Sequence, residues 1–249
     1  MEYTRPIVLS IAGLDPCGGA GLLADIKTIE QHKCLGFGVT TAITCQTEDR
    51  FKSVRWLSEN EIVCQIEPLL QQYDIAAVKI GLIQNTQILN RILDILTVRP
   101  IPNIVWDPVL TASAGFDFNN YADTIDFPSL LKKITLITPN LPEACHLTSE
   151  SNALNAARIL SDCTNVLLKG GHHPTEQGTD HLFVHSQEIS LPPVAKQIYP
   201  KHGSGCILSS AIATFLAKNE SVERACTNAK HYIEKALAST PNLLAYHHV

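Results

Sequence analysis

The chain has 249 residues, of which 45% are hydrophobic and 17% are charged, so an intrinsically disordered protein is excluded. Its formal net charge is −5 and no stretch is rich in Lys and Arg, which disfavours a nucleic-acid partner, because such a partner needs a basic surface. No run of about 18 apolar residues exists, so no membrane-spanning helix is expected. The N-terminal sequence lacks the features of a signal peptide, and the eight cysteines form no CxxC pair. We therefore expect a cytoplasmic protein with reduced thiols.

Short apolar, β-branched segments alternate with longer segments of helical period along the chain. The predicted strands are residues 7–11, 38–44, 76–80, 104–106, 136–138, 166–169 and 181–184. The predicted helices are residues 21–31, 59–72, 84–96, 142–146, 154–162, 205–218 and 221–238. This alternation indicates parallel βαβ units with helices on both faces of one sheet. No linker, low-complexity segment or internal repeat interrupts it, so we expect one domain over residues 1–249.

Polar and Gly-rich residues follow several of the predicted strands. In open parallel sheets, ligands bind beyond the carboxyl ends of the strands, so these positions are the first candidates for a site. Residues 13–21 read GLDPCGGAG and connect a strand to a helix. Their glycines let the backbone approach a ligand and expose N–H groups. The segment matches neither the P-loop nor the dinucleotide fingerprint, and taken alone it is equally well explained as a tight turn.

A second Gly-rich segment, residues 202–206 with the sequence HGSGC, opens an amphipathic helix. Free N–H groups and the helix dipole at such an end form an anion site, which can hold a phosphoryl group during its transfer. Cys206 lies in the first turn, where the dipole is expected to lower the pKa of a thiol so that it can accept a proton from a substrate hydroxyl. A structural cysteine is the alternative, but the two flanking glycines favour a functional one.

Two carboxylates and one lysine follow other predicted strands. Glu143 is placed to reach Mg²⁺ or its water shell, and Asp107 has the same potential, because hard cations prefer carboxylate oxygens. Each also has a structural interpretation, since an acidic residue that favours the dipole is common at the start of a helix. Lys169 can meet a phosphate as a point charge or can simply be solvated.

In this order and spacing, the segments resemble the hydroxymethylpyrimidine/phosphomethylpyrimidine kinase family of the ribokinase-like superfamily. The matching segments are residues 12–21, 24–28, 79–82, 107–109, 137–144, 169–172 and 202–206. The resemblance implies an α/β fold, a ribokinase-like three-layer αβα sandwich with a central, mostly parallel sheet. It also implies phosphorylation of 4-amino-5-hydroxymethyl-2-methylpyrimidine, and in many members of its monophosphate, in thiamine biosynthesis. ATP and Mg²⁺ are the implied cofactors, and members of the family are often dimers.

The resemblance also assigns roles to residues. Cys206 takes the place of the aspartate base of most ribokinase relatives, beside an anion hole formed by Gly203, Ser204 and Gly205. The pyrimidine pocket is implied to comprise Gly13, Ala20, Asp25, Gln46, Leu82 and Val109. Within that pocket Gln46 hydrogen-bonds the ring, and an amide suits an aminopyrimidine edge because it is both donor and acceptor. The implied nucleotide-binding residues are Asn140, Lys169 and Gly171, and the implied metal-binding residues are Asp107 and Glu143.

Some positions depart from the family's pattern. Cys17 stands where Ser is usual, Leu82 replaces a common Met, and Ser204 replaces Thr. Ser113 stands where many members carry Lys. The second phosphorylation is therefore left open, because its substrate already carries a phosphate and a nearby positive charge is missing.

Other functions stay open. A pyridoxal kinase of the same fold shares the Gly-x-Gly-Cys loop, but the position of Gln46 tends to be apolar in those most like this chain. A cysteine-dependent hydrolase would use Cys206 with His202 or His172 as the base, yet no nucleophile elbow with a third partner is present. A binding protein without turnover is disfavoured because the Gly203–Cys206 loop is retained. The ten histidines show no zinc-ligand spacing, so a structural metal is not expected.

Overall fold

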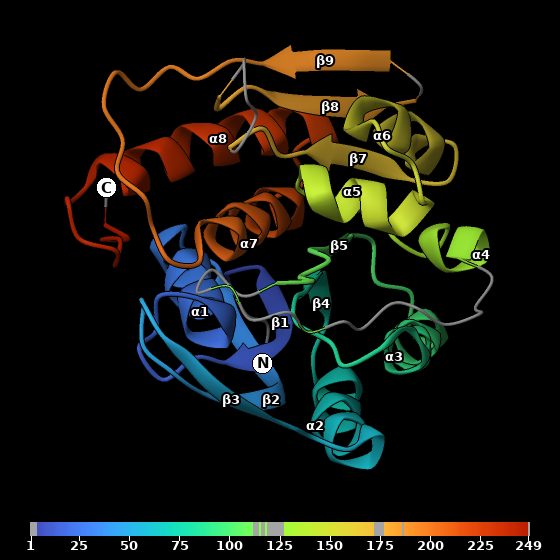
Figure 1. The fold of residues 1–249 in the computed structure, drawn as a ribbon. Helices are drawn as coiled ribbons and strands as arrows, with labels where there is room; N and C mark the ends of the chain where they lie inside the picture. Colours follow the sequence, from blue (N-terminus) through green and yellow to red (C-terminus); the bar gives the residue numbers. More distant parts are fainter. Residues whose placement is uncertain are drawn as a thin grey trace.

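The computed structural model describes residues 4–111, 115, 118, 127–171, 177–185 and 187–248. Its strands form one nine-stranded sheet in the order β3-β2-β1-β4-β5-β6-β7-β8-β9 (Figure 1). The strands are β1 (Ile7–Leu14), β2 (Leu35–Gln46), β3 (Phe51–Trp56), β4 (Ile75–Ile80), β5 (Ile104–Trp106), β6 (Leu136–Ile137), β7 (Asn165–Leu168), β8 (Asp180–Val184) and β9 (Gln187–Leu191). The run from β2 to β7 is parallel, whereas β3, β8 and β9 each pair antiparallel with a neighbour.

Helices cover both faces of this sheet, which gives the three layers that were expected. The helices are α1 (Gly21–Gln31), α2 (Glu59–Gln72), α3 (Thr86–Val98), α4 (Phe127–Leu131), α5 (Leu141–Thr148), α6 (Ala153–Ser161), α7 (Ser204–Ala217) and α8 (Val222–Ala238). One hydrophobic core joins the sheet to α2, α3, α4, α5 and α6, and a second core joins it to α1, α7 and α8. None of the helices in the described part of the chain is long and apolar enough to cross a membrane.

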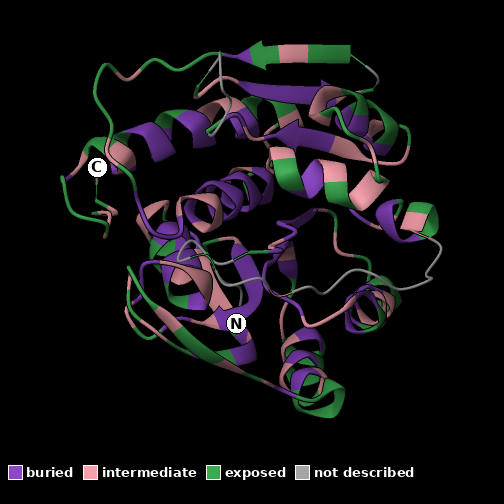
Figure 2. Cartoon of the chain, in the orientation of Figure 1, coloured by how far each residue is buried: buried purple, intermediate pink, exposed green. Residues whose placement is uncertain are grey.

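The central strands are mostly apolar because both of their faces are buried (Figure 2). In β1, Ile7 and Leu9 pack into the first core, and Val8 between them packs into the second. Lys79 of β4 interrupts this pattern, since it is a charged residue with no exposed surface. A buried charge needs a partner, so its surroundings are of immediate interest.

Local signals define where several helices begin. Ser58 and Glu61 form a capping box before α2: the Ser58 hydroxyl accepts the Glu61 N–H at 3.3 Å, and the Glu61 carboxylate accepts the Ser58 N–H at 2.7 Å. The Asn85 side chain accepts the Ile88 N–H at 2.9 Å at the start of α3. These caps satisfy amide groups that have no partner within the helix.

All the predicted strands and helices are present, most of them with ends shifted by a few residues, but three further elements were not predicted. Strands β3 and β9 are short and partly exposed, and their sequences FKSVRW and QEISL carry polar residues that hide a strand signal. Helix α4 has five residues, too few to show a helical period. Both missed strands lie at the edges of the sheet, where one side of the strand is unpaired and polar residues are tolerated.

Candidate active site

A cavity of about 850 Å³ is lined by residues that follow the carboxyl ends of β1, β4, β5 and β7. This volume suits a small-molecule ligand. Its lining includes every predicted site residue except Asp25. The cavity also receives residues from the C-terminal part of the chain, among them Ile233 and Leu237 of α8 and Leu243.

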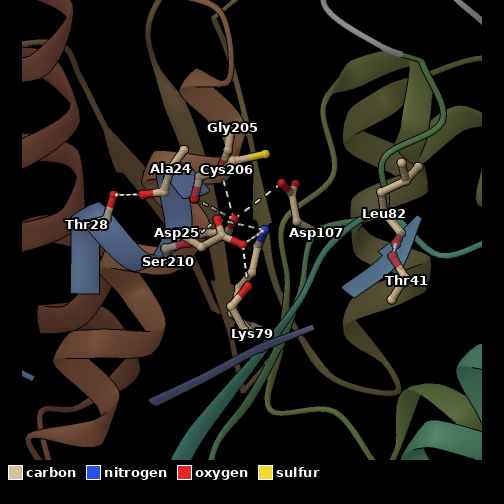
Figure 3. A network of polar contacts seen from close by, with 12 residues as sticks. Ala24, Asp25, Thr28, Thr41, Lys79, Leu82, Asp107, Gly205, Cys206 and Ser210 are labelled. Carbon is tan, nitrogen blue, oxygen red and sulfur yellow. Dashed lines mark hydrogen bonds and ion pairs between the residues drawn. The ribbon is translucent and has the colours of Figure 1, made fainter. Parts of the chain in front are cut away.

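Asp25 has no exposed surface and lies behind the cavity wall, so the expectation that it lines the pyrimidine pocket is wrong for this structure. Figure 3 shows its carboxylate paired with Lys79, at 2.8 and 3.0 Å, and also accepting the Ser210 hydroxyl at 2.5 Å. The Ser10 hydroxyl donates to it at 2.6 Å. Asp25 therefore joins α1, β1, β4 and α7 around a single carboxylate.

Lys79 does line the cavity, and Asp25 keeps it charged. Burial alone would lower the pKa of Lys79, but the Asp25 carboxylate outweighs this effect and raises that pKa above its ordinary value. The resemblance includes residues 79–82 but assigns Lys79 no role. The structure makes it a fixed positive charge beside Cys206, whose thiol pKa it acts to lower.

The first turn of α7 lies against the Gly13–Gly21 loop. Gly203 has a φ of +74°, and a Cβ at this position would collide with the Gly19 carbonyl oxygen. Only glycine allows this backbone conformation together with such a close approach. No side chain caps α7, and its first-turn residues line the cavity, which leaves the amide groups of a helix N-terminus for an anion.

Cys206 lies deep in the cavity and is only partly accessible. Burial raises the pKa of its thiol to about 11, and the nearby Asp25 and Asp107 carboxylates add to this rise. The positive charge of Lys79 and a hydrogen bond from the Gly21 backbone N–H act to lower the pKa, but they do not outweigh the effect of burial. The net shift of this pKa is therefore upward, opposite to the direction expected from the helix dipole, and it favours the thiol form at neutral pH.

Asp107, Lys169 and Glu143 form a charged group on another part of the wall. Lys169 Nζ lies 2.7 Å from Asp107 Oδ1 and 3.7 Å from Glu143 Oε2. Burial would raise the pKa of Asp107, but the Lys169 and Lys79 ammonium groups hold it below its ordinary value. The Thr138 and Ser209 hydroxyls also donate to Asp107, at 3.1 and 3.3 Å.

Asn140 and Glu143 form a capping box at the start of α5. The Asn140 side chain accepts the Glu143 N–H at 2.9 Å, and the Glu143 carboxylate accepts the Asn140 N–H at 2.7 Å. The structural interpretation of Glu143 as a residue of the helix start is therefore correct. Asn140 and Glu143 also line the cavity, so their structural role at the start of α5 does not exclude a role in ligand binding.

Glu143 fits a hard cation better than Asp107 does. Asp107 is already neutralised by Lys169 at 2.7 Å, whereas the same ammonium group is 3.7 Å from Glu143. Glu143 is also buried, and a buried carboxylate with a distant counter-charge gains from a further positive charge beside it.

The part of the cavity near Gln46 has a different character. The side-chain carbonyl oxygen of Gln46 is buried and has no hydrogen-bond partner within the described residues. Leu82 and Val109 supply apolar wall, and the Thr41 hydroxyl holds the Leu82 carbonyl oxygen at 2.6 Å. A ligand with an apolar ring and an amino group would satisfy both features.

Asp15 and His202 form a pair in the cavity wall that the sequence did not predict. His202 Nε2 lies 2.9 Å from Asp15 Oδ2, and the Ala20 and Cys17 N–H groups donate to the same carboxylate at 2.8 and 3.0 Å. Burial would raise the pKa of Asp15, but these bonds lower it to about 2. The two residues are 187 positions apart, and their only signal was that each belongs to a Gly-rich segment. Two residues discussed from the sequence, Ser113 and His172, lie outside the described residues.

The αβα sandwich and a cavity that combines an uncapped helix N-terminus with buried lysines and carboxylates define a small-molecule kinase of the ribokinase-like fold. The model of the phosphomethylpyrimidine kinase family matches residues 15–249, and the chain belongs to this family.

Two curated relatives agree with this assignment. The chain is 33% identical to the hydroxymethylpyrimidine/phosphomethylpyrimidine kinase of Escherichia coli strain K12, over 96% of this chain and 93% of the relative. It is 34% identical to the protein of the same name from Rhizobium meliloti strain 1021, over 95% and 92% of the two chains.

Solved structures are similar to the whole fold. The pyridoxal kinase of Staphylococcus aureus in complex with pyridoxal has a TM-score of 0.82 at 26% identity, over 99% of this chain and 94% of that chain. The same kinase has been solved with ADP and with AMP-PCP. The phosphomethylpyrimidine kinase of Clostridium difficile 630 has a TM-score of 0.74 at 28% identity, over 93% and 99% of the two chains.

Proposed function

We propose that this protein transfers the γ-phosphate of ATP to the hydroxymethyl group of 4-amino-5-hydroxymethyl-2-methylpyrimidine, and then phosphorylates the monophosphate, in thiamine biosynthesis. The observation that carries the proposal is a single cavity with two chemically distinct regions joined by the first turn of α7. Curated relatives with this activity in their names match nearly the whole chain.

The first turn of α7 contacts both regions. Gly203 lies against Gly19 and Ala20 of the first Gly-rich loop. Two residues later, a Cβ on Gly205 would lie only 3.3 Å from Lys169 Nζ. A phosphoryl group held by the amides of this turn would therefore lie between the pyrimidine region and the charged region.

Gln46 supports the choice of an aminopyrimidine. Its buried carbonyl oxygen has no partner among the described residues, and the exocyclic amino group of the substrate is a matching donor. A site built around such a group discriminates strongly against analogues that lack it, because the protein atom is then left unpaired.

The residues of the chain then act mainly by position and charge. Transfer through a loose transition state demands that the hydroxyl be aligned with the γ-phosphate and that the phosphoryl oxygens be stabilised. The α7 amides and Lys169 provide this stabilisation. Cys206 is protonated at rest, so we assign it a relay: its Sγ accepts the hydroxyl proton late in the transfer while its own proton passes to a phosphoryl oxygen. Such proton transfer contributes roughly 10²–10⁴-fold to a rate.

We also propose Mg²⁺ as the cation that accompanies ATP. Glu143 would hold it directly or through a water of its shell, and the ion supplies charge neutralisation for the phosphates. A homodimer stays a prediction from the resemblance, and a cytoplasmic location stays a prediction from the N-terminal sequence and the cysteines.

An ATP-coupled assay tests the function with three acceptors, namely the pyrimidine alcohol, its monophosphate and pyridoxal. We expect ADP formation that depends on the pyrimidine alcohol, with a higher kcat/KM for it than for pyridoxal. The absence of pyrimidine-dependent turnover would contradict the proposal. A preference for pyridoxal would favour the second candidate, which the similarity to pyridoxal kinase structures supports.

A further inference from the structure

Three side chains of the kinds that bind transition metals meet beside the cavity. They are the Asp15 carboxylate, the Cys17 thiol and the His202 imidazole, and their ligand atoms all lie within 4.8 Å of one another. Cys17 Sγ is 3.2 Å from Asp15 Oδ2, and His202 Nε2 is 2.9 Å from the same oxygen. The fold thus creates a metal-ligand set that no sequence spacing reveals.

The geometry is close to that of a tetrahedral Zn²⁺ site. With bonds of about 2.0 Å to oxygen and nitrogen and about 2.3 Å to sulfur, the donor atoms of such a site stand roughly 3.3–3.6 Å apart. The two distances to Asp15 Oδ2 are shorter than this by a few tenths of an ångström, and the third, between Cys17 Sγ and His202 Nε2, lies within 4.8 Å, so small shifts of these side chains would be needed to bind the ion. The thiol also sets the chemistry, because thiolate selects Zn²⁺ and similar metals over Mg²⁺.

The ligand set is held in place yet open to the cavity. The backbone N–H groups of Cys17 and Ala20 donate to the Asp15 carboxylate at 3.0 and 2.8 Å and hold it in place. The backbone N–H of His202 donates to the Leu243 carbonyl oxygen at 2.9 Å. Asp15 and His202 line the cavity, and Cys17 is half-buried. An ion bound by the three side chains would therefore have its fourth position available for water.

The other nitrogen of His202 sets the expected strength of binding. His202 Nδ1 is buried and has no partner among the described residues. Metal-bound imidazoles usually donate their second N–H to an acceptor, and loss of that acceptor weakens metal affinity. A reversible ion is therefore expected here, not a permanent structural one.

We propose that Asp15, Cys17 and His202 form a reversible site for Zn²⁺ or another thiophilic divalent metal, and that occupation of this site inhibits the enzyme. Binding would replace the Asp15–His202 hydrogen bond, release the thiol proton to solvent, and tie the first Gly-rich loop to the segment that precedes α7. The metal site stands on the geometry alone, whereas its inhibitory effect rests on the proposed kinase function.

Binding can be measured without the kinase reaction. Purified protein is titrated with Co²⁺ in millimolar Mg²⁺ and no nucleotide, and the near-ultraviolet thiolate-to-cobalt absorption band is recorded. Zn²⁺ affinity follows from competition. We expect the band in the wild type and its loss in Cys17→Ser, with Zn²⁺ bound roughly 100-fold more weakly, since even outer-shell changes cost 10–100-fold.

The serine variant keeps a hydroxyl that can donate to Asp15, so its fold should persist, which circular dichroism checks. Cys64→Ser is the matched control, because Cys64 is exposed on α2 and should not affect the band. No thiolate band in the wild type, or an unchanged band in Cys17→Ser, would overturn the site. If the band is lost in Cys17→Ser but Zn²⁺ inhibits both proteins equally, the inhibitory effect is overturned. Failure of the pyrimidine assay would leave the absorption result interpretable.

Discussion

At the scale of single residues, Cys206 and Gln46 are the two residues in the cavity on which the proposed reaction depends most. In the proposed reaction Cys206 handles a proton although burial disfavours its charged form, while Gln46 presents a buried oxygen that has no partner among the described residues. The two groups belong to different parts of the proposed reaction, so each can be tested separately.

The reactivity of Cys206 should follow its raised pKa. Because burial disfavours the thiolate, its fraction grows only as the pH approaches about 11, compared with about 8.5 for a free cysteine. We expect alkylation of Cys206 by iodoacetamide, followed by peptide mass spectrometry, to be slow at pH 8 and to rise towards pH 11. A midpoint below the free-cysteine value would instead support the dipole-lowered thiol expected from the sequence.

Gln46→Met tests the recognition of the pyrimidine. The substitution removes the buried carbonyl oxygen while nearly preserving side-chain length, so the amino group of the substrate loses its partner. We expect KM for the pyrimidine to rise at least tenfold, since a well-matched polar contact discriminates by more than this, while KM for ATP stays unchanged. Steady-state kinetics with each substrate varied in turn measures this, and equal changes in both constants would disprove the assigned role.

Nearly all of the site residues predicted from the sequence line the cavity, because Gly-rich and polar segments after strands mark a site in this class of fold. The prediction failed for Asp25. The motif places an aspartate near the pocket, but whether it faces the ligand depends on Lys79, a residue 54 positions away that takes both carboxylate oxygens. The Asp15–His202 pair was missed for the same reason, because local sequence carries no information about such contacts.

At the scale of elements, the site depends on close contact between segments that are far apart in the chain. Gly203 permits one such contact, between the start of α7 and the first Gly-rich loop. Asp25 and Lys79 provide another, between α1 and β4. Both contacts lie on the face of the sheet that α1, α7 and α8 cover.

Gly203→Ala should lower both stability and activity. An alanine would have to keep a φ of +74° and would place its Cβ against the Gly19 carbonyl oxygen, a strain on the order of 1–3 kcal/mol. Urea unfolding measures the loss. Gly171→Ala is the control for stability, since a Cβ there meets no atom of the described residues within 4 Å. Equal stability of both variants would show that the contact at Gly203 is unimportant.

Asp25 and Lys79 should behave as one unit in a double-mutant cycle. Both side chains have no exposed surface, so Lys79→Met or Asp25→Asn alone leaves a buried group without its counter-charge, at a cost of about 3–5 kcal/mol. The double variant Asp25→Asn/Lys79→Met should cost clearly less than the sum of the two single changes. Additive losses in chemical unfolding would argue against a coupled pair.

The two strands that were not predicted, β3 and β9, show why edge strands are harder to recognise in a sequence than buried ones. The parallel strands were predicted because burial on two faces leaves a continuous apolar sequence. Strands β3 and β9 pair on one side only, so Lys52, Arg55 and Glu188 are tolerated in them. Phe51 of β3 nevertheless lines the cavity, so an element that the sequence did not reveal contributes to the site.

At the scale of the whole molecule, the cavity is assembled from both ends of the chain. Gly13 follows the first strand, and Leu243 lies beyond the last helix, yet both line the same space. The first turn of α7 joins its two regions, and the proposed reaction requires ATP and the pyrimidine to meet there. The position of the terminal phosphate is therefore the central point.

A crystal structure with the pyrimidine alcohol and a non-hydrolysable ATP analogue tests this point most directly. We expect the γ-phosphate within hydrogen-bond distance of the backbone amides of Gly203–Cys206, and the hydroxymethyl oxygen between Cys206 Sγ and the γ-phosphorus. A γ-phosphate bound elsewhere in the cavity, out of reach of the first turn of α7, would contradict the proposed mechanism.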